Sequence, residues 1–152
     1  MSGVSKAIVQ PLLSWYDAGH RDLPWRSEPA PYRVWVSEIM LQQTRVEAVR
    51  GYFSRWMNAL PDIPALAAAD EAVYTKLWEG LGYYSRVRNL HRAAVLLCEE
   101  YGGELPADYD RLLALPGVGE YTAGAVASIA FGLPVPAVDG NVLRVAVRLD
   151  ND

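Results

Sequence analysis

The sequence predicts an all-α fold, and three observations support this. Apolar residues recur at intervals of three and four along several segments, which is the pattern of amphipathic helices. No segment shows sustained alternation of apolar and polar residues bounded by turns, so essentially no sheet is expected. Of the 152 residues, 51% are hydrophobic and 21% are charged, enough for one compact domain with its own core.

The first two strongly amphipathic helices are separated by a short turn. Apolar residues line one face over 32–41, and the helix is expected to stop there, leaving 42–43 in a turn. Thr44 followed by Glu47 is a capping-box pattern, which predicts that the next helix starts at Thr44. The apolar stripe of that helix covers 46–60, and Pro61 punctuates the connection after it.

The second half of the chain predicts one long helix and three shorter ones. The stripe over 87–101 is closed by the glycine pair at 102–103. Helices are expected near 109–114 and at about 120–131. A last helix begins after Asp139.

Charge and cysteine content limit the classes of function. A net charge of −4 counts mildly against a nucleic-acid-binding protein, although three arginines that crowd together, Arg86, Arg88 and Arg92, allow a local basic face. The single cysteine, Cys98, permits no internal disulfide, which fits a reducing, cytoplasmic protein. The sequence contains neither a membrane-spanning apolar run nor the apolar segment of a signal peptide.

A glycine-containing loop at 115–119, Leu-Pro-Gly-Val-Gly, joins two predicted helices. Glycine lets a backbone turn tightly and approach another surface closely. The free N–H groups of the following helix then form an anion site, which could hold a DNA phosphate. The alternative is a plain helix–helix turn.

Two carboxylates have contrasting surroundings. Asp139 is placed to cap the final helix, where backbone N–H groups would keep it ionised, as stabilisation of a sugar cation requires. Glu38 has apolar helical neighbours, which tend to raise the pKa of a carboxyl group and suit it to donate a proton. The alternatives are a purely structural cap at Asp139 and a solvated or arginine-paired Glu38.

Four stretches, 37–44, 80–91, 115–126 and 132–142, resemble the MutY-type adenine DNA glycosylases of the helix-hairpin-helix superfamily that includes endonuclease III. The resemblance runs from about residue 12 to residue 149. It implies an all-α helix-hairpin-helix DNA glycosylase fold with a six-helix barrel core. The implied reaction is hydrolysis of the N-glycosidic bond of adenine mispaired with 8-oxoguanine or guanine, in base excision repair.

The resemblance also implies a domain organisation. Residues 1–22 form an N-terminal helical segment that normally packs on later helices, 23–137 form the barrel core with the helix-hairpin-helix at about 109–131, and 138–152 hold the catalytic aspartate and the start of the next helix. Family members continue with four cysteines that hold a [4Fe-4S] cluster and with a C-terminal domain. One cysteine cannot ligate such a cluster. The chain is therefore expected to be truncated before that region and to carry no cluster.

By resemblance, Glu38 is the general acid and base, and Asp139 stabilises the sugar cation, with Tyr121 and Asn141 also at the catalytic site. Relatives that cut the DNA strand carry a Schiff-base lysine where this sequence has Tyr121, so a monofunctional glycosylase is expected. Glu120 departs from the basic or neutral residue usual in the family, and its charge could weaken DNA binding.

Base flipping requires residues that fill the gap in the base stack. By resemblance, Gln43 and Tyr83 are the wedge residues, and the base pocket includes Trp25, Arg26 and Leu41; for each aromatic residue the alternative is core packing. The residues expected at DNA phosphates are Leu115, Gly117, Val118, Gly119, Thr122, Arg86 and Arg88. The two arginines could equally lie on a solvated helix face. A monovalent cation is implied at the hairpin carbonyls.

The implied partner is double-stranded DNA with an adenine:8-oxoguanine or adenine:guanine mispair, bound by a monomer that contacts no membrane, in the cytoplasm at the bacterial nucleoid. Two alternatives stay open. One is a non-catalytic helix-hairpin-helix module that binds DNA without base excision. The other is an endonuclease III-like enzyme for oxidised pyrimidines, against which Glu38 and Tyr121 both argue.

Overall fold

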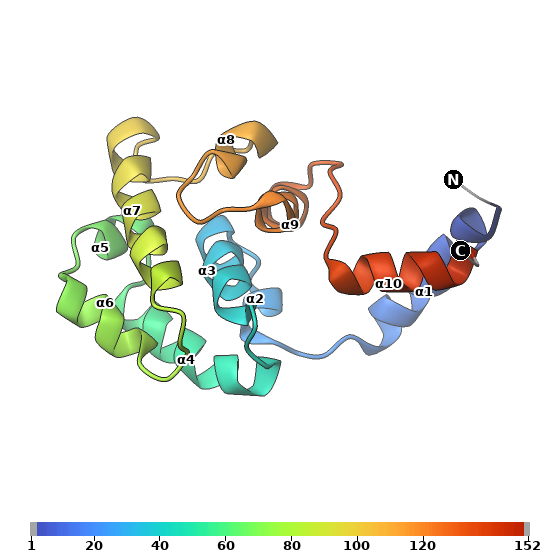
Figure 1. Cartoon of the computed structure of the whole chain (residues 1–152), viewed down its shortest axis with the longest axis horizontal. Coiled ribbons are helices and arrows are strands. Elements are labelled where there is room, and N and C mark those ends of the chain that lie inside the picture. Colours follow the sequence, from blue (N-terminus) through green and yellow to red (C-terminus); the bar gives the residue numbers. More distant parts are fainter. Residues whose placement is uncertain (1–2, 151–152) are drawn as a thin grey trace. The chain divides into compact units, whose positions relative to one another are not determined.

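A computed structural model of the chain describes residues 3–150, with side chains from residue 6 onward, and these residues form ten helices and no strand (Figure 1). The all-α prediction is therefore confirmed for them. The helices are α1 (Gly3–Gly19), α2 (Pro24–Ser27), α3 (Pro31–Leu41), α4 (Val46–Ala59), α5 (Ile63–Ala67), α6 (Glu71–Trp78), α7 (Ser85–Glu100), α8 (Tyr109–Leu113), α9 (Glu120–Phe131) and α10 (Gly140–Asp150).

The chain forms two compact units. The larger unit spans Leu23–Ala137 and contains α2 to α9. The smaller unit combines the segment that ends at Asp22 with the segment that begins at Val138, and within it α1 packs against α10. None of the described side chains of α10 is buried. Among the described residues, no helix is both long and apolar enough to cross a membrane.

Helix α3 is the central element of the larger unit, where it packs against α2, α4, α7 and α9 (Figure 1). Its residues are apolar around most of the circumference, as the sequence predicts, and seven of them are buried. Three fully buried tryptophans fill the core of this unit: Trp35 of α3, Trp56 of α4 and Trp78 of α6. Trp56 and Trp78 pack edge to face, with ring centroids 5.7 Å apart.

A buried polar chain crosses this core. The Trp56 Nε1–H donates to the Tyr32 hydroxyl at 3.0 Å, and that hydroxyl donates to the Leu60 carbonyl at 2.8 Å. Burial raises the pKa of the Tyr32 phenol, so it stays neutral and able to donate. These bonds fix the start of α3 against the C-terminal end of α4.

The predicted start of α4 at Thr44 is wrong. The helix begins at Val46, and its N-cap is Arg45, with no side-chain capping bond. Thr44 Oγ1 instead donates to the Gln42 carbonyl at 3.5 Å. The reason is the left-handed backbone of Gln43, with φ 60°, which turns the chain before the helix and leaves Thr44 in the bend rather than at the cap. Helix α2 was not predicted.

Candidate functional site

Glu38 lies in the last turn of α3 and is half-buried. The residues on either side of it in sequence, Ser37 and Ile39, are buried. The Ser37 hydroxyl donates to the Val34 carbonyl one turn earlier, at 2.8 Å, so it is satisfied within the helix. The Glu38 carboxylate is therefore carried by a rigid, deeply packed helix, close to the point where the helix ends.

The two predicted wedge residues have a common backbone feature. Gln43, in the turn after α3, has φ 60°, and Tyr83, in the loop before α7, has φ 49°. Among the described residues these are the two non-glycine positions with positive φ. Such a conformation costs on the order of 1–3 kcal/mol and persists only where the surroundings impose it. Both side chains are exposed, that of Tyr83 to 64%.

The guanidinium of Arg86 lies between these two turns. Its Nη1 donates to the Ile39 carbonyl at 2.8 Å and to the Gln42 carbonyl at 2.5 Å. Its Nη2 lies 3.3 Å from the carbonyls of both Leu81 and Gly82. Burial lowers the pKa of Arg86 from its ordinary value. Phosphate binding by this arginine stays a prediction, and the structure shows that its Nη atoms donate to the protein backbone.

Aromatic rings complete the surroundings of this guanidinium. It lies over the ring of Trp78, 5.3 Å from the centroid, and over that of Tyr83 at 5.5 Å. Both distances suit a cation–π interaction. The predicted wedge residue Tyr83 and the core residue Trp78 therefore both contact the Arg86 guanidinium.

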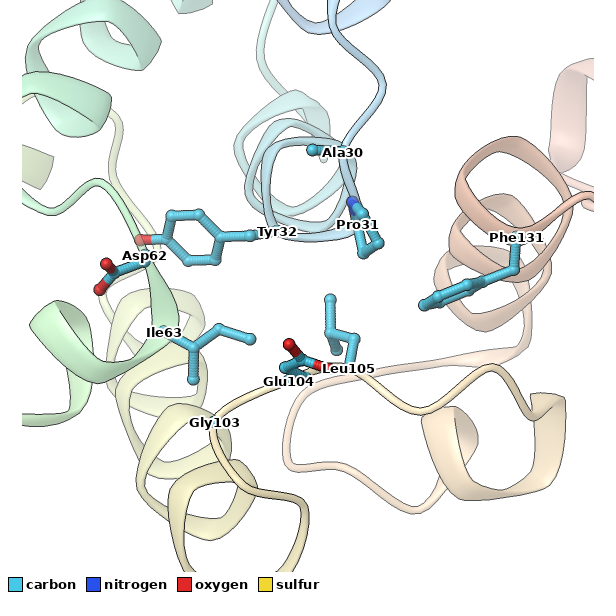
Figure 2. Close-up of a pocket in the computed structure, with 9 residues that line it drawn as sticks. All are labelled: Ala30, Pro31, Tyr32, Asp62, Ile63, Gly103, Glu104, Leu105 and Phe131. Carbon is cyan, nitrogen blue, oxygen red and sulfur yellow. The ribbon is translucent and has the colours of Figure 1, made fainter.

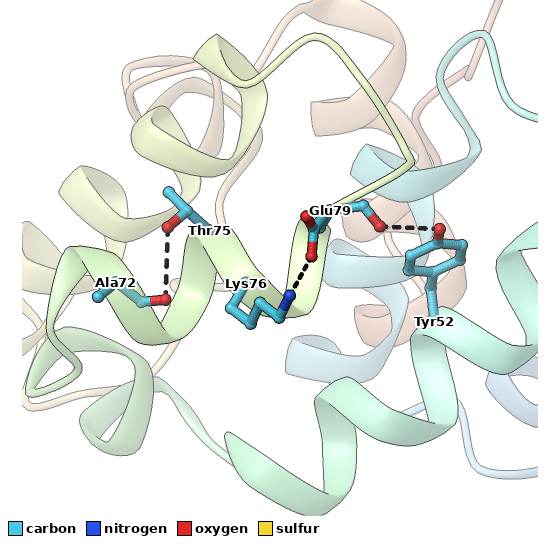
Figure 3. Close-up of polar contacts among 5 residues, drawn as sticks. All are labelled: Tyr52, Ala72, Thr75, Lys76 and Glu79. Carbon is cyan, nitrogen blue, oxygen red and sulfur yellow. Dashed lines mark hydrogen bonds and ion pairs between the residues drawn. The ribbon is translucent and has the colours of Figure 1, made fainter.

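The loop that leads to Tyr83 is held at its other end by α4. The Tyr52 hydroxyl donates to the Glu79 carbonyl at 2.9 Å (Figure 3). A Cβ on Gly80, which has φ 101°, would lie 2.2 Å from the Tyr52 hydroxyl oxygen. Figure 3 also shows the exposed ion pair between Lys76 and the Glu79 side chain. Only glycine allows this close approach of α4 to the loop.

The hairpin at 115–119 is a tight turn between α8 and α9. The Val118 N–H donates to the Leu115 carbonyl at 3.1 Å, and Gly117 has φ 74°. Proline followed by a left-handed glycine at the two central positions is the signature of a type II turn. Leu115 and Val118 are buried and anchor the turn, whereas Gly117 and Gly119 are exposed.

Gly119 is the N-cap of α9 and is exposed, and no side chain caps the N-terminus of that helix. Thr122, predicted at a DNA phosphate, is only 2% exposed. Its hydroxyl accepts a hydrogen bond from Gln42 Nε2 at 3.2 Å. The side chain of Thr122 therefore ties α9 to the turn that carries Gln43 rather than facing solvent. Sequence reasoning missed this contact, which joins residues 80 positions apart.

Asp139 and Asn141 belong to the smaller unit, at the start of α10. The Val142 N–H donates to Asp139 Oδ1 at 2.8 Å, which is the N-cap geometry that the sequence predicts. Asn141 Nδ2 donates to the other carboxylate oxygen, Oδ2, at 3.0 Å. The Val142 bond first, and then the Asn141 bond, lower the pKa of Asp139. Asp139 is thus an ionised carboxylate at neutral pH.

The remaining predicted residues divide between core and surface. Trp25 is 6% exposed and packs edge to face on Phe53, with centroids 5.3 Å apart, which is the core-packing alternative. Leu41 is half-buried, whereas Arg26 and Tyr121 are exposed. Arg88 is exposed and forms an ion pair with Glu71, with its Nε 3.1 Å from the carboxylate.

A pocket of about 370 Å³ lies in the larger unit between the start of α3, α5, the segment after α7 and the end of α9 (Figure 2). Apolar side chains of Ile63, Leu105 and Phe131 point into it, and carboxylates of Asp62 and Glu104 lie at its edge. None of the predicted site residues lines this pocket.

The residues present do not fit an iron–sulfur cluster. The chain has one cysteine, Cys98, on α7, whereas such a cluster takes four thiolate ligands. Within residues 3–150, no group of three or more His, Cys, Asp or Glu side chains is arranged to hold a metal ion.

Comparison with known proteins places this geometry in a family. Residues 36–152 match the model of the HhH-GPD superfamily of base excision DNA repair proteins. The chain is 52% identical over 147 residues to the adenine DNA glycosylase of Mus musculus, an alignment that covers 91% of this chain and 28% of that protein. The chain therefore spans little more than a quarter of the length of this curated relative.

Solved structures agree with the family match. A thermostable thymine-DNA glycosylase superimposes with a TM-score of 0.89 at 28% identity, covering 98% of this chain and 71% of that one. A non-covalent endonuclease III–DNA complex superimposes with a TM-score of 0.82 at 27% identity, covering 96% and 68%. The chain belongs to the HhH-GPD superfamily of base excision DNA repair proteins.

Proposed function

We propose that this chain is the catalytic part of a DNA glycosylase that hydrolyses the N-glycosidic bond of adenine paired with 8-oxoguanine or guanine. The observation that carries the proposal is Glu38, half-buried at the end of α3 and directly before the turn of Gln43, in a chain 52% identical to a mouse adenine DNA glycosylase. The turn would enter the DNA, and the carboxyl group would then stand beside the extruded base.

In the proposed reaction, Glu38 protonates a ring nitrogen of adenine, and the bond between the base and the sugar C1′ breaks with both electrons leaving on the base. A proton donor in this step must carry its proton before the bond breaks. The ionised Asp139 stabilises the positive sugar. Water then adds to C1′, and the Glu38 carboxylate accepts its proton, which restores the acid.

The proposed enzyme is monofunctional because Tyr121 replaces the lysine whose amine would form a Schiff base with the sugar. DNA would be held by the hairpin, whose exposed glycines allow close approach and whose following helix directs N–H groups outward. The monovalent cation at the hairpin carbonyls, a monomeric state and a cytoplasmic location at the bacterial nucleoid belong to the same proposal.

The test uses excess protein and a duplex with one adenine opposite 8-oxoguanine, followed by alkali, which breaks abasic sites. The wild-type chain and Glu99→Gln, which changes an exposed glutamate of α7, are expected to give alkali-dependent cleavage at the adenine. Glu38→Gln is expected to give none while circular dichroism shows an unchanged helix content.

Three results would contradict parts of the proposal. Cleavage that persists in Glu38→Gln would remove this residue from the chemistry. DNA binding by a folded wild-type chain without cleavage would identify a non-catalytic binding module. An adduct trapped by borohydride would indicate Schiff-base chemistry and a bifunctional enzyme instead.

A further inference from the structure

We propose that Arg86 is the positioning residue that sets both DNA-inserting turns at once, by holding the peptide plane that precedes each left-handed residue. The inference rests on the proposed function, because it gives these turns their task in adenine excision. It assigns Arg86 a role different from the phosphate contact that its sequence position suggests.

The conformation of a left-handed residue depends on the peptide plane that precedes it. The angle φ of a residue describes the orientation of its own Cα substituents relative to the preceding peptide plane. Fixing the carbonyl of that preceding peptide therefore restricts φ. The two peptides concerned here end in the carbonyls of Gln42, before Gln43, and Gly82, before Tyr83.

Both of these carbonyls accept hydrogen bonds from the same guanidinium. Arg86 Nη1 bonds the Gln42 carbonyl at 2.5 Å, and Nη2 lies 3.3 Å from the Gly82 carbonyl. The Gly82 carbonyl also accepts from Trp78 Nε1 at 3.0 Å. Gln42 and Gly82 are 40 residues apart, so the planar fork of one side chain joins two turns that the sequence separates widely.

The same guanidinium also connects the turns to their supports. Its bond to the Ile39 carbonyl, at 2.8 Å, fixes the last turn of α3, where Glu38 lies. Its contact with the Tyr83 ring, 5.5 Å from the centroid, restrains the exposed side chain directly. Arg86 thus couples the positions of the two wedge residues to each other and to the helix of the proposed acid.

Arg86→Lys tests this role, because lysine keeps the positive charge but lacks the planar fork that reaches two carbonyls. The matched control is Arg92→Lys, six residues along α7, where the arginine is exposed and its Nη1 lies 3.5 Å from the Asn89 side-chain oxygen. Backbone amide hydrogen exchange of the 152-residue chain is measured first, without DNA. In Arg86→Lys, exchange is expected to accelerate about tenfold or more in both turns, at 43–45 and 83–85, since charged hydrogen bonds are lost. The control is expected to match the wild type.

DNA binding supplies the second measurement. The affinities for a duplex with adenine opposite 8-oxoguanine and for the same duplex fully matched are compared. Arg86→Lys is expected to lower the preference for the mispaired duplex about tenfold and to leave the affinity for the matched duplex nearly unchanged. The reason is that the two turns contact DNA from which a base has been extruded. A phosphate contact would predict little change in Arg86→Lys, which keeps the charge, and an equal loss on both duplexes when the charge is removed.

Unchanged exchange in Arg86→Lys, or acceleration in only one turn, would overturn the proposal. So would an unaltered preference for the mispaired duplex in a variant whose turns exchange faster. A wild-type chain that shows no such preference would instead refute the proposed function, and the exchange measurement would then decide the coupling of the turns by itself. Arg86→Leu is the variant that removes the charge; if it fails to fold, the exchange and binding of Arg86→Lys still decide the proposal.

Discussion

Replacement of Gly117 by alanine tests whether the hairpin conformation depends on glycine. Gly117 is the left-handed residue of the turn, with φ 74°. A Cβ at this position would lie 2.7 Å from the Cβ of Asn89 on α7, closer than real Cβ contacts allow. The substitution therefore adds backbone strain and a steric overlap with a helix at the same time.

The magnitude follows from these two contributions. A left-handed conformation costs a non-glycine residue about 1 kcal/mol relative to glycine. Overpacking typically costs about 1–3 kcal/mol, and here the overlap is with a side-chain atom attached directly to the backbone, which has little freedom to move. We expect Gly117→Ala to lower the free energy of unfolding by about 2–4 kcal/mol.

Gly119→Ala is the matched control within the same hairpin. Gly119 has φ −95°, and a Cβ built there meets nothing within 4 Å. The loss of a favourable N-cap glycine and the smaller entropy of the unfolded chain oppose each other, so the change should stay within about 1 kcal/mol.

Urea denaturation followed by tryptophan fluorescence measures both variants, since four tryptophans of the larger unit are buried. DNA affinity is measured beside it and should fall in Gly117→Ala, because the hairpin must shift. Equal stability of Gly117→Ala and Gly119→Ala would refute the reasoning.

Three further predictions concern the core, α9 and α10. Tyr32→Phe leaves a buried indole N–H and a buried carbonyl without partners, and it should cost about 2–4 kcal/mol in urea denaturation; a smaller loss than in Gly119→Ala would contradict the importance of this polar chain. Gly124→Ala places a Cβ 2.1 Å from the Pro136 carbonyl oxygen, so a loss of about 2 kcal/mol or more is expected, and a thermal midpoint equal to the wild type would disprove the contact. The pKa of Asp139 is lowered, so its capping contribution to stability is fully present above the pKa of the unfolded chain, near 3.8. That contribution is lost as pH falls through the lower pKa of the folded chain. NMR titration of the Asp139 carboxyl carbon should give a midpoint below 3.8, and a midpoint above it would contradict the cap.

The sequence alone determined the features that depend on neighbouring residues. The helix at 32–41 follows from an apolar periodicity that local spacing fixes, and the turn at Pro116 and Gly117 follows from the φ preferences of those two residues. The Asp139 cap likewise involves an N–H only three residues away. Each of these interactions lies within one turn of the chain, so composition and spacing were sufficient to predict it.

The same local reasoning failed at Thr44, where the capping-box pattern predicted the wrong helix start. The left-handed Gln43 displaced the start of α4 to Val46, and Gln43 is left-handed in a turn that Arg86 holds from 44 residues away. A tertiary contact therefore overrode a local preference, as happens when a half-buried charge must satisfy its donors.

Only the tertiary structure decided which side chains face solvent and which hold the site together. The roles of Thr122 and Arg86 at DNA phosphates stay predictions, but the structure shows that the Thr122 side chain is buried against Gln42 and that Arg86 donates to carbonyls in two distant turns. Partners of this kind are set by the packing of α3, α7 and α9, and no periodicity within a single segment encodes them. The physical reason is that a buried donor takes whichever acceptor the fold brings within reach.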